Sequence, residues 1–350
     1  MRQERNPTPV ATLEAGRSYL PATTLAEYLR DVATMYPWLQ AELDFGRVGA
    51  ADALRVLAGT MTEFDSDETG RGDSYRQAQK DASVRLVGIQ QLLDWAVPKD
   101  SPDGVTLLDV LGGDGTLARA VGSPSGNPLS KTTIVTGDIS GEMVERALAH
   151  GLPAVRQAAD FLFLRDHAVD GVLLAYGTHH IAPHLRQDAA AEAVRVVKPG
   201  GRVVLHDFEE TSPMAQFFNR VVHENSAAGH DYTHFSRESL TEIFDGIGTP
   251  ARVLDMYDPL IVRAATPDDA RQGMCDYVGS MYGIRAHLEA QGGLDATWRL
   301  LEEHFDHTAF LSGSARGLDI PPAPVVYPSR GQFMAEVPRV AVVAVARKAG

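Results

Sequence analysis

Four of the twelve histidines form two closely spaced sets whose side chains could hold a metal ion. His179 and His180 are adjacent and follow an apolar stretch, and His230 and His234 are separated by three residues. Side chains at i and i+4 can lie together, and imidazole nitrogens suit Zn, Fe, Ni or Co. Each set alone is also typical of histidines that only line a pocket. The hypothesis of a metal site therefore depends on the two sets converging.

Such convergence requires a fold that brings both sets to one edge of a sheet. The stretch Val105–Ala118 is typical of a strand, a glycine-rich turn and the start of a helix, which is how a doubly wound α/β domain begins. Glycines at 112, 113 and 115 would let the backbone pass close to a nucleotide-like ligand. A loose dinucleotide fingerprint and a purely structural turn explain the same glycines.

The segments that follow narrow these alternatives. Thr132–Thr136 is predicted to be a second strand and leads to Asp138. The carboxylate of Asp138 could accept hydrogen bonds from both hydroxyl groups of a ribose. Gly171–Tyr176 is apolar enough for a buried parallel strand. Val194–Leu205 is typical of a helix end, a Pro-Gly-Gly turn and another strand.

This ordered set resembles the class I S-adenosylmethionine-dependent methyltransferases, firmly over Leu107 to Asp207. The resemblance implies an α/β fold with a doubly wound sheet of seven strands, the last one antiparallel, and S-adenosylmethionine as the cofactor. The sequence departs from the family at one position, because Leu111 stands where the family has the first glycine of the loop. The cofactor-binding residues that the resemblance implies are Asp109, Gly112, Gly113, Gly115, Asp138, Asp160, Phe161 and Ala175.

A closer resemblance is to the metal-dependent α-keto acid C-methyltransferases, which β-methylate phenylpyruvate or 4-methyl-2-oxovalerate for nonribosomal peptide precursors. In that group one metal-binding histidine follows the fourth strand and a second lies in a Gly-His-Asp stretch, which correspond to His179 and His230 here. Tyr176 stands where the phenylpyruvate enzyme has a methionine. The third ligand is left open between His234, which we favour, and His180.

The chemistry that this resemblance implies is methyl transfer to the β-carbon of a 2-oxo acid. The acid could chelate the metal through its carboxylate and carbonyl oxygens, and the metal would stabilise an enolate as the β-proton leaves. His180 or Tyr176 is the expected base. His206 is either a base or part of the pocket wall. The nucleophilic carbon would then attack the methyl group of the cofactor in line.

Three other functions compete with this prediction. A metal-independent small-molecule O-methyltransferase could use His179 or His180 as its base. A non-catalytic cofactor-binding scaffold is the second alternative, and Leu111 would favour it. A nicotinamide oxidoreductase is the third, but Asp160, Phe161 and the Pro-Gly-Gly turn speak against it.

The chain has more residues than one cofactor domain needs. Residues 1–100 carry apolar side chains at helical spacing and are predicted to form a helical region. This region could cap the cofactor domain or form the contact of a homodimer. Residues 101–258 with 339–350 are predicted to form the sheet domain, and residues 259–338 a helical lid inserted before the last strand. Arg76 and Arg85 lie near the end of the first region. Either could reach an anionic substrate, although a solvated position is expected for both.

The composition limits the partners. A net charge of −14 and the lack of a basic run argue against nucleic acid. The single cysteine, Cys275, allows no internal disulfide and fits a reducing compartment. No stretch reads as a signal peptide or a membrane span. We therefore expect a cytoplasmic enzyme that acts on a small molecule.

Overall fold

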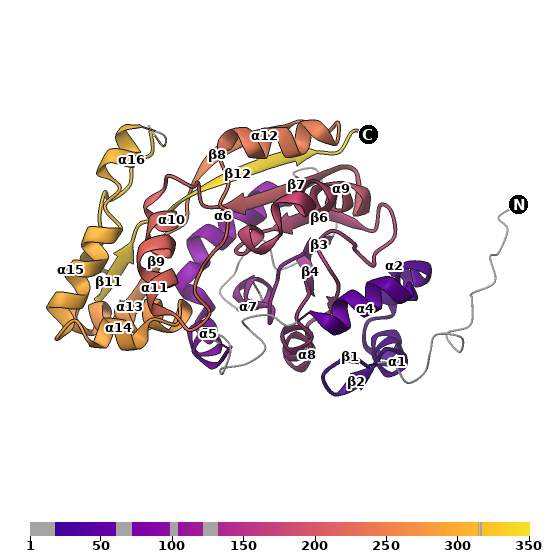
Figure 1. Cartoon of the computed structure of the whole chain (residues 1–350), viewed down its shortest axis with the longest axis horizontal. Helices are drawn as coiled ribbons and strands as arrows, with labels where there is room; N and C mark the ends of the chain where they lie inside the picture. Colours follow the sequence, from indigo (N-terminus) through magenta and orange to yellow (C-terminus); the bar gives the residue numbers. More distant parts are fainter. Residues whose placement is uncertain (1–17, 61–71, 99–103, 122–131, 314, 316) are drawn as a thin grey trace, which may run out of the picture.

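The computed structural model describes residues 18–60, 72–98, 104–121, 132–313, 315 and 317–350. A seven-stranded sheet crosses its centre in the order β5-β4-β3-β6-β7-β12-β8 (Figure 1). Strand β12 is antiparallel to its neighbours β7 and β8, and the pairs from β5 to β7 are parallel. The predicted α/β class is confirmed. The strands are β3 (Val105–Asp109), β4 (Thr132–Asp138), β5 (Ala154–Arg156), β6 (Val169–Leu174), β7 (Val197–Asp207), β8 (Ala251–Tyr257) and β12 (Val340–Arg347).

Both faces of this sheet are buried, and successive residues of a strand contribute to different cores. Val203 and Leu205 of β7 belong to one apolar cluster, and Val204 between them belongs to the other. A strand that is buried on both sides appears in the sequence as a continuous apolar run, and for this reason β6 and β7 are predictable. The helices that follow or precede these strands are α6 (Leu86–Ala96), α7 (Thr116–Val121), α8 (Gly141–Ala149), α9 (Arg186–Val196) and α12 (Arg237–Gly246).

The first hundred residues occupy two separate places. Residues 18–60 pack beside β4 and β5, whereas residues 72–96 lie beside the C-terminal insert (Figure 1). The earlier part contains a short hairpin that the sequence did not predict. Its elements are β1 (Ser18–Leu20), β2 (Thr23–Thr24), α1 (Leu25–Met35), α2 (Pro37–Glu42), α3 (Phe45–Val48) and α4 (Ala51–Gly59), and the later part adds α5 (Gly72–Gln79) and the 3₁₀ helix η2 (Ala82–Arg85).

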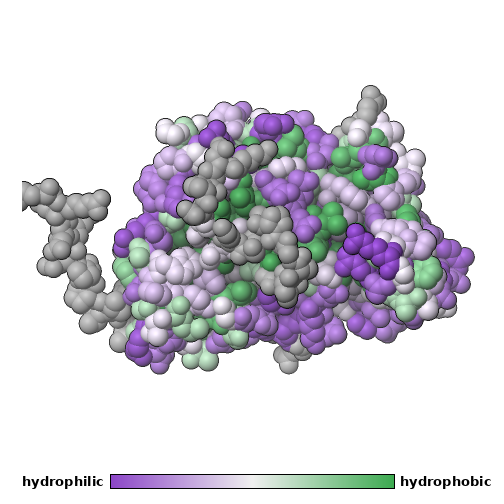
Figure 2. All heavy atoms as spheres, turned by 180° about the vertical axis from the view of Figure 1, so that it is seen from behind, coloured by the Kyte–Doolittle hydropathy of each residue, from purple (hydrophilic) through white to green (hydrophobic). Residues whose placement is uncertain are grey.

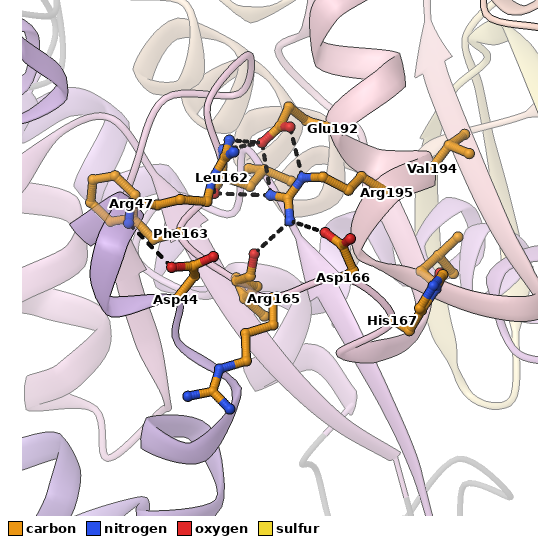
Figure 3. Close-up of polar contacts among 12 residues, drawn as sticks. Asp44, Arg47, Leu162, Phe163, Arg165, Asp166, His167, Glu192, Val194 and Arg195 are labelled. Carbon is orange, nitrogen blue, oxygen red and sulfur yellow. Dashed lines mark hydrogen bonds and ion pairs between the residues drawn. The ribbon is translucent and has the colours of Figure 1, made fainter. Parts of the chain in front are cut away.

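A polar network attaches α3 to the sheet domain (Figure 3). Arg47 donates through Nε to the carbonyl oxygen of Leu162, 2.7 Å, and through Nη2 to Glu192, 2.5 Å. The carboxylate of Glu192 also accepts from the backbone N–H of Leu162, 2.8 Å, and from Nε of Arg195, 2.8 Å. These half-buried charges neutralise each other, so the early N-terminal helices are fastened to α9 and to the loop after β5.

The insert between β8 and β12 contains more than the predicted helices. Its strands β9 (Leu260–Ala264), β10 (Val325–Ser329) and β11 (Gln332–Val337) form a second, antiparallel sheet in the order β10-β11-β9. Its buried side chains share one apolar cluster with α6, including Ile89 and Val278. Its role as a lid stays a prediction. The helices of the insert are α13 (Pro267–Met281), α14 (Arg285–Glu289), α15 (Leu294–His304) and α16 (Thr308–Ser312).

The surface of the described residues is mainly hydrophilic on the face shown in Figure 2, with apolar residues confined to small areas. Met35 and Trp38 are among the large apolar side chains that are exposed. No helix of the described residues combines the length and apolar character needed to cross a bilayer. The predicted homodimer stays a prediction.

Gly171 allows the end of α6 to approach β6, and its replacement tests this packing. A Cβ at Gly171 would lie 2.5 Å from the carbonyl oxygen of Ala96. We expect Gly171→Ala to lower the free energy of unfolding by about 1–3 kcal/mol, because backbone must move to relieve the contact. Gly59→Ala is the control, since nothing lies within 4 Å of a Cβ there. Chemical denaturation of both variants measures the difference, and equal stabilities would contradict this account.

Candidate active site

The glycine-rich loop after β3 is held against the end of β4. Gly112 donates its N–H to the carbonyl oxygen of Gly137, 2.8 Å, and Gly113 donates to Oδ2 of Asp138, 2.9 Å. Gly115 has φ of +84°, in the left-handed region where glycine is preferred. The side chain of Leu111 packs against the first core. Leu111 is therefore compatible with a loop that binds the cofactor.

The other predicted cofactor residues follow β5 and β6, which lie on either side of β3 and β4, at the same edge of the sheet. Ala175 follows β6 and is buried, and Asp160 and Phe161 lie in the loop after β5. The guanidinium of Arg47 covers one side of the Phe161 ring, 4.0 Å from its centroid. This edge is where ligands bind in doubly wound sheets, so the predicted residues are placed consistently with one cofactor site.

Asp109 ends β3 beneath this loop and has unusual acid–base behaviour. Burial raises the pKa of its carboxyl to about 7, and the nearby charge of Asp138 adds to the shift, while Arg85 opposes it. Asp138 accepts hydrogen bonds from Gly113 and from the N–H of Ser140, 2.9 Å. A buried acid and a half-buried acid at this end of the site favour a ligand with positive charge.

The structure brings together the three histidines predicted to bind a metal. His179 belongs to the 3₁₀ turn η3 (Thr178–His180) after β6, and His230 and His234 belong to the loop before α12. Their ring centroids are separated by 5.0 Å (His179 and His230), 4.9 Å (His179 and His234) and 5.5 Å (His230 and His234). Three imidazoles on one ion at ordinary bond lengths would give roughly 4.6–5.3 Å. The two separations that involve His179 fall within this range, and the separation of His230 from His234 exceeds it.

Asp207, at the end of β7, links two of these histidines. His179 Nδ1 lies 2.9 Å from Oδ2 of Asp207, and His234 Nδ1 lies 3.4 Å from Oδ1. Burial would raise the pKa of Asp207, but the two histidines hold it well below its ordinary value. Ligand atoms of His179, Asp207 and His234 all lie within 4.8 Å of one another. From the sequence, His206 and Asp207 are expected to supply a base or a hydrogen-bonding pocket wall, and Asp207 is not predicted as a ligand.

Two ligand sets can be distinguished, and the one that contains Asp207 already has its ligand atoms within 4.8 Å of one another, whereas His230 does not join that group. Asp207 could be a direct ligand with His179 and His234. It could instead orient both rings through Nδ1, as carboxylates behind metal-binding histidines do, so that Nε2 of each faces the ion together with His230. Nε2 of His234 is buried and has no hydrogen-bond partner among the described residues, so it is available to an ion, but the second arrangement also requires His230 to move closer to the other two rings.

A π-helical turn supplies one wall of the cluster. Helix α10 (Pro213–Phe217) continues into the π-helix η5 (Phe218–Val222) and then α11 (His223–Asn225), and π-helical turns are frequent at functional sites. The ring of Phe218 stacks on His230, with centroids 4.2 Å apart and planes inclined by 11°. It lies 5.5 Å from His234, again nearly parallel. The apolar ring thus fixes the orientation of both imidazoles.

A pocket opens beside the histidine cluster and is enclosed by segments far apart in the sequence. Tyr75 comes from α5, Phe208 and Phe218 follow β7, and Met281 and Tyr282 come from the end of α13. His179 and His180 also line it. The walls are largely aromatic, so the pocket suits a small organic substrate with an apolar part.

Two buried arginines line the same pocket. Arg85 is 7% exposed and Arg339 is 3% exposed. A solvated position for Arg85 was expected from the sequence, and the structure contradicts it, because η2 turns its side chain inward over the ring of Tyr176, 4.8 Å from the centroid. Arg76 is not among the residues that line the pocket. Sequence reasoning did not identify Arg339, which lies between β11 and β12.

The three predicted catalytic side chains all line this pocket, in different environments. Tyr176 has φ of +58°, and its hydroxyl donates to Asp258, 3.0 Å. Burial and Asp258 raise the pKa of Tyr176 well above its ordinary value, which favours a hydrogen-bonding role over that of a base. His206 is fully buried, with Nε2 3.6 Å from Asp258. His180 is half-buried at the pocket wall and is the best placed of the three to exchange a proton.

The chain is similar in sequence to known methyltransferases. A family described as "Methyltransferase domain" matches residues 108–205. The ubiquinone/menaquinone biosynthesis C-methyltransferase of Brucella anthropi is 32% identical over 182 residues, which are 47% of this chain and 67% of that enzyme. Its Brucella abortus counterpart is 30% identical over the same share of this chain and 65% of its own length, so the chain covers less than two thirds of that relative.

Solved structures are similar at lower identity. The YcgJ protein of Bacillus subtilis is 15% identical with a TM-score of 0.45, covering 75% of this chain and 98% of its own. A phosphoethanolamine N-methyltransferase of Haemonchus contortus is 14% identical with a TM-score of 0.44, covering 81% of this chain and 58% of its own. On the family match and the Brucella relatives, the chain belongs to the class I S-adenosylmethionine-dependent methyltransferases.

The pKa of Asp109 predicts how cofactor affinity depends on pH. S-adenosylmethionine is a cation, so it favours the ionised carboxylate, and lowering the pH through about 7 neutralises that carboxylate. We expect affinity to rise by up to about tenfold from pH 6 to pH 8 because the ionised fraction rises by that factor. Calorimetric titration measures it, with Asp109→Asn as the comparison. The titration of S-adenosylmethionine itself affects the wild type and the Asp109→Asn variant equally. If the affinity of both proteins depends on pH in the same way, Asp109 has no role in this dependence.

Proposed function

We propose that this methyltransferase transfers a methyl group to the β-carbon of a 2-oxo acid that is chelated by a metal ion, such as 4-methyl-2-oxovalerate or phenylpyruvate, in the synthesis of natural-product precursors. The observation that carries the proposal is the cluster of His179, His230 and His234 beside a pocket that contains Arg85. The Brucella relatives are named as C-methyltransferases, which agrees with carbon as the acceptor.

The proposed roles follow from the positions of the side chains. A transition metal ion held by the histidines would act as a Lewis acid toward the oxygen atoms of the oxo acid. Arg85 is charged and buried, and it would pair with the substrate carboxylate. His180, on the pocket wall, would remove the β-proton. The aromatic walls would hold the substrate side chain and exclude water, so that the nucleophilic carbon stays in line with the methyl group.

An O-methyltransferase without a metal is the second candidate, and one observation favours it. His179 and Asp207 form a hydrogen-bonded pair, 2.9 Å, and an imidazole oriented by a carboxylate is a common general base. In that function the acceptor would be a hydroxyl group near His179. Activity that survives a strong chelator, in protein without stoichiometric metal, would favour this candidate over the first.

Histidine variants test the metal site. We expect His179→Ala, His230→Ala and His234→Ala each to lower metal content and methyl transfer together, while cofactor affinity stays nearly unchanged. Asp207→Asn should lower metal affinity by about 10–100-fold, since it removes the group that orients two ligands. His180→Ala should keep the metal and lose exchange of the β-proton for deuterium in the oxo acid. Elemental analysis and calorimetry report these results, and full metal content in all three alanine variants would refute the site.

Arginine variants test the substrate assignment. We expect Arg85→Gln to raise KM for 4-methyl-2-oxovalerate by about tenfold or more, because a charge-assisted hydrogen bond to the carboxylate is lost. Arg76→Gln is the matched control, because Arg76 does not line the pocket. Steady-state kinetics distinguish them. Equal KM values in the two variants would show that Arg85 does not bind the substrate.

A further inference from the structure

The two buried arginines of the pocket differ in how they are neutralised. Arg339 donates through Nη2 to Oδ2 of Asp258, 2.6 Å, and through Nε to the carbonyl oxygen of Asp258, 2.9 Å. Arg85 donates through Nη2 to the neutral side chain of Gln79, 2.5 Å. Its Nε has no partner, and no carboxylate pairs with it, among the residues that the structure describes. Of the two arginines, Arg85 is therefore the one with no carboxylate in ion-pair contact among the described residues.

Asp258 is held in place from several directions. It is fully buried, directly after β8, and its N–H donates to the carbonyl oxygen of Arg339, 3.0 Å. Oδ1 accepts from the hydroxyl of Tyr176, 3.0 Å. A Cβ on Gly88 of α6 would lie 1.8 Å from the same Oδ1, so α6 approaches the carboxylate closely. Asp258 cannot swing away to release Arg339 without disturbing all of these contacts.

We propose that Asp258 determines substrate specificity as a positioning residue, by reserving Arg339 so that the pocket accepts one anionic group and not two. This inference rests on the proposed function, because it specifies a monocarboxylic 2-oxo acid as the substrate class. The substrate carboxylate pairs with Arg85. A second carboxylate would enter a pocket whose other guanidinium is already paired, and a buried charge without a partner is strongly disfavoured.

A charge-removing substitution at Asp258 tests the proposal. Asp258→Asn keeps the shape but leaves Arg339 unpaired in the pocket. Relative to wild type, the ratio of kcat/KM for 2-oxoglutarate to that for 4-methyl-2-oxovalerate should rise by about tenfold or more. The matched control is the double variant Asp258→Asn with Arg339→Gln, which has no free guanidinium besides Arg85 and should return to the wild-type ratio. A folded Asp258→Asn protein with an unchanged ratio overturns the proposal.

Binding measurements separate this proposal from the proposed function. If the wild type methylates no 2-oxo acid, the proposed function fails. Calorimetric titration with succinate and butyrate then still tests Asp258, because only Asp258→Asn should bind the dicarboxylate about tenfold or more tightly than wild type does. If Asp258→Asn does not fold, Arg339→Gln provides the test. The Arg339→Gln variant leaves the carboxylate of Asp258 without its cation, so it should bind butyrate more weakly and keep its affinity for the cofactor. An unchanged affinity for butyrate overturns the proposal.

Discussion

The arrangement of the active site depends on the buried carboxylate of Asp207. Leu174 and Leu205 pair across β6 and β7, so the residues that follow the two strands emerge side by side. Oδ2 of Asp207 accepts from the N–H of His179, 2.7 Å, and from the hydroxyl of Thr178. An ionised group at this depth is tolerated only when it is well hydrogen-bonded. The turn that carries His179 and the loop that carries His234 are therefore held where the carboxylate needs them.

The charges of the site are divided between its two halves. The ends of β3 and β4 carry Asp109 and Asp138, and the pocket beyond β6 carries Arg85 and Arg339. A cationic methyl donor and an anionic acceptor would each find the opposite charge, which orients both before reaction. The opposing effect of Arg85 on the pKa of Asp109 shows that the two halves interact electrostatically. Binding of one ligand should therefore influence binding of the other.

Sequence reasoning succeeded where the signal is local. The glycine-rich turn after β3 and the apolar runs of β6 and β7 each lie within a short stretch. The spacing of His230 and His234 is equally local, and its role in metal binding stays a prediction. Sequence reasoning failed for Arg85, because helical periodicity in a short segment does not show which face meets the pocket. The hairpin of β10 and β11 turns at Arg330 and Gly331, and both residues have positive φ, as in a tight hairpin turn. The glycine at position 331 is the local feature of the sequence that indicates this turn. Strand β9 pairs with β11 across some seventy residues, and no local pattern reveals that.

Arg339 and Asp258 show why the remainder of the site is the harder part to predict. The match to the methyltransferase family covers residues 108–205, a continuous segment that contains the cofactor loop and His179. The substrate pocket adds residues from α5 and η2 before that segment and from the insert after it, and α13 packs directly against α5. The ion pair of Arg339 with Asp258 joins the two ends of the insert, which are far apart in the sequence. The pocket is therefore built from segments outside the family match as well as from the end of β6 within it.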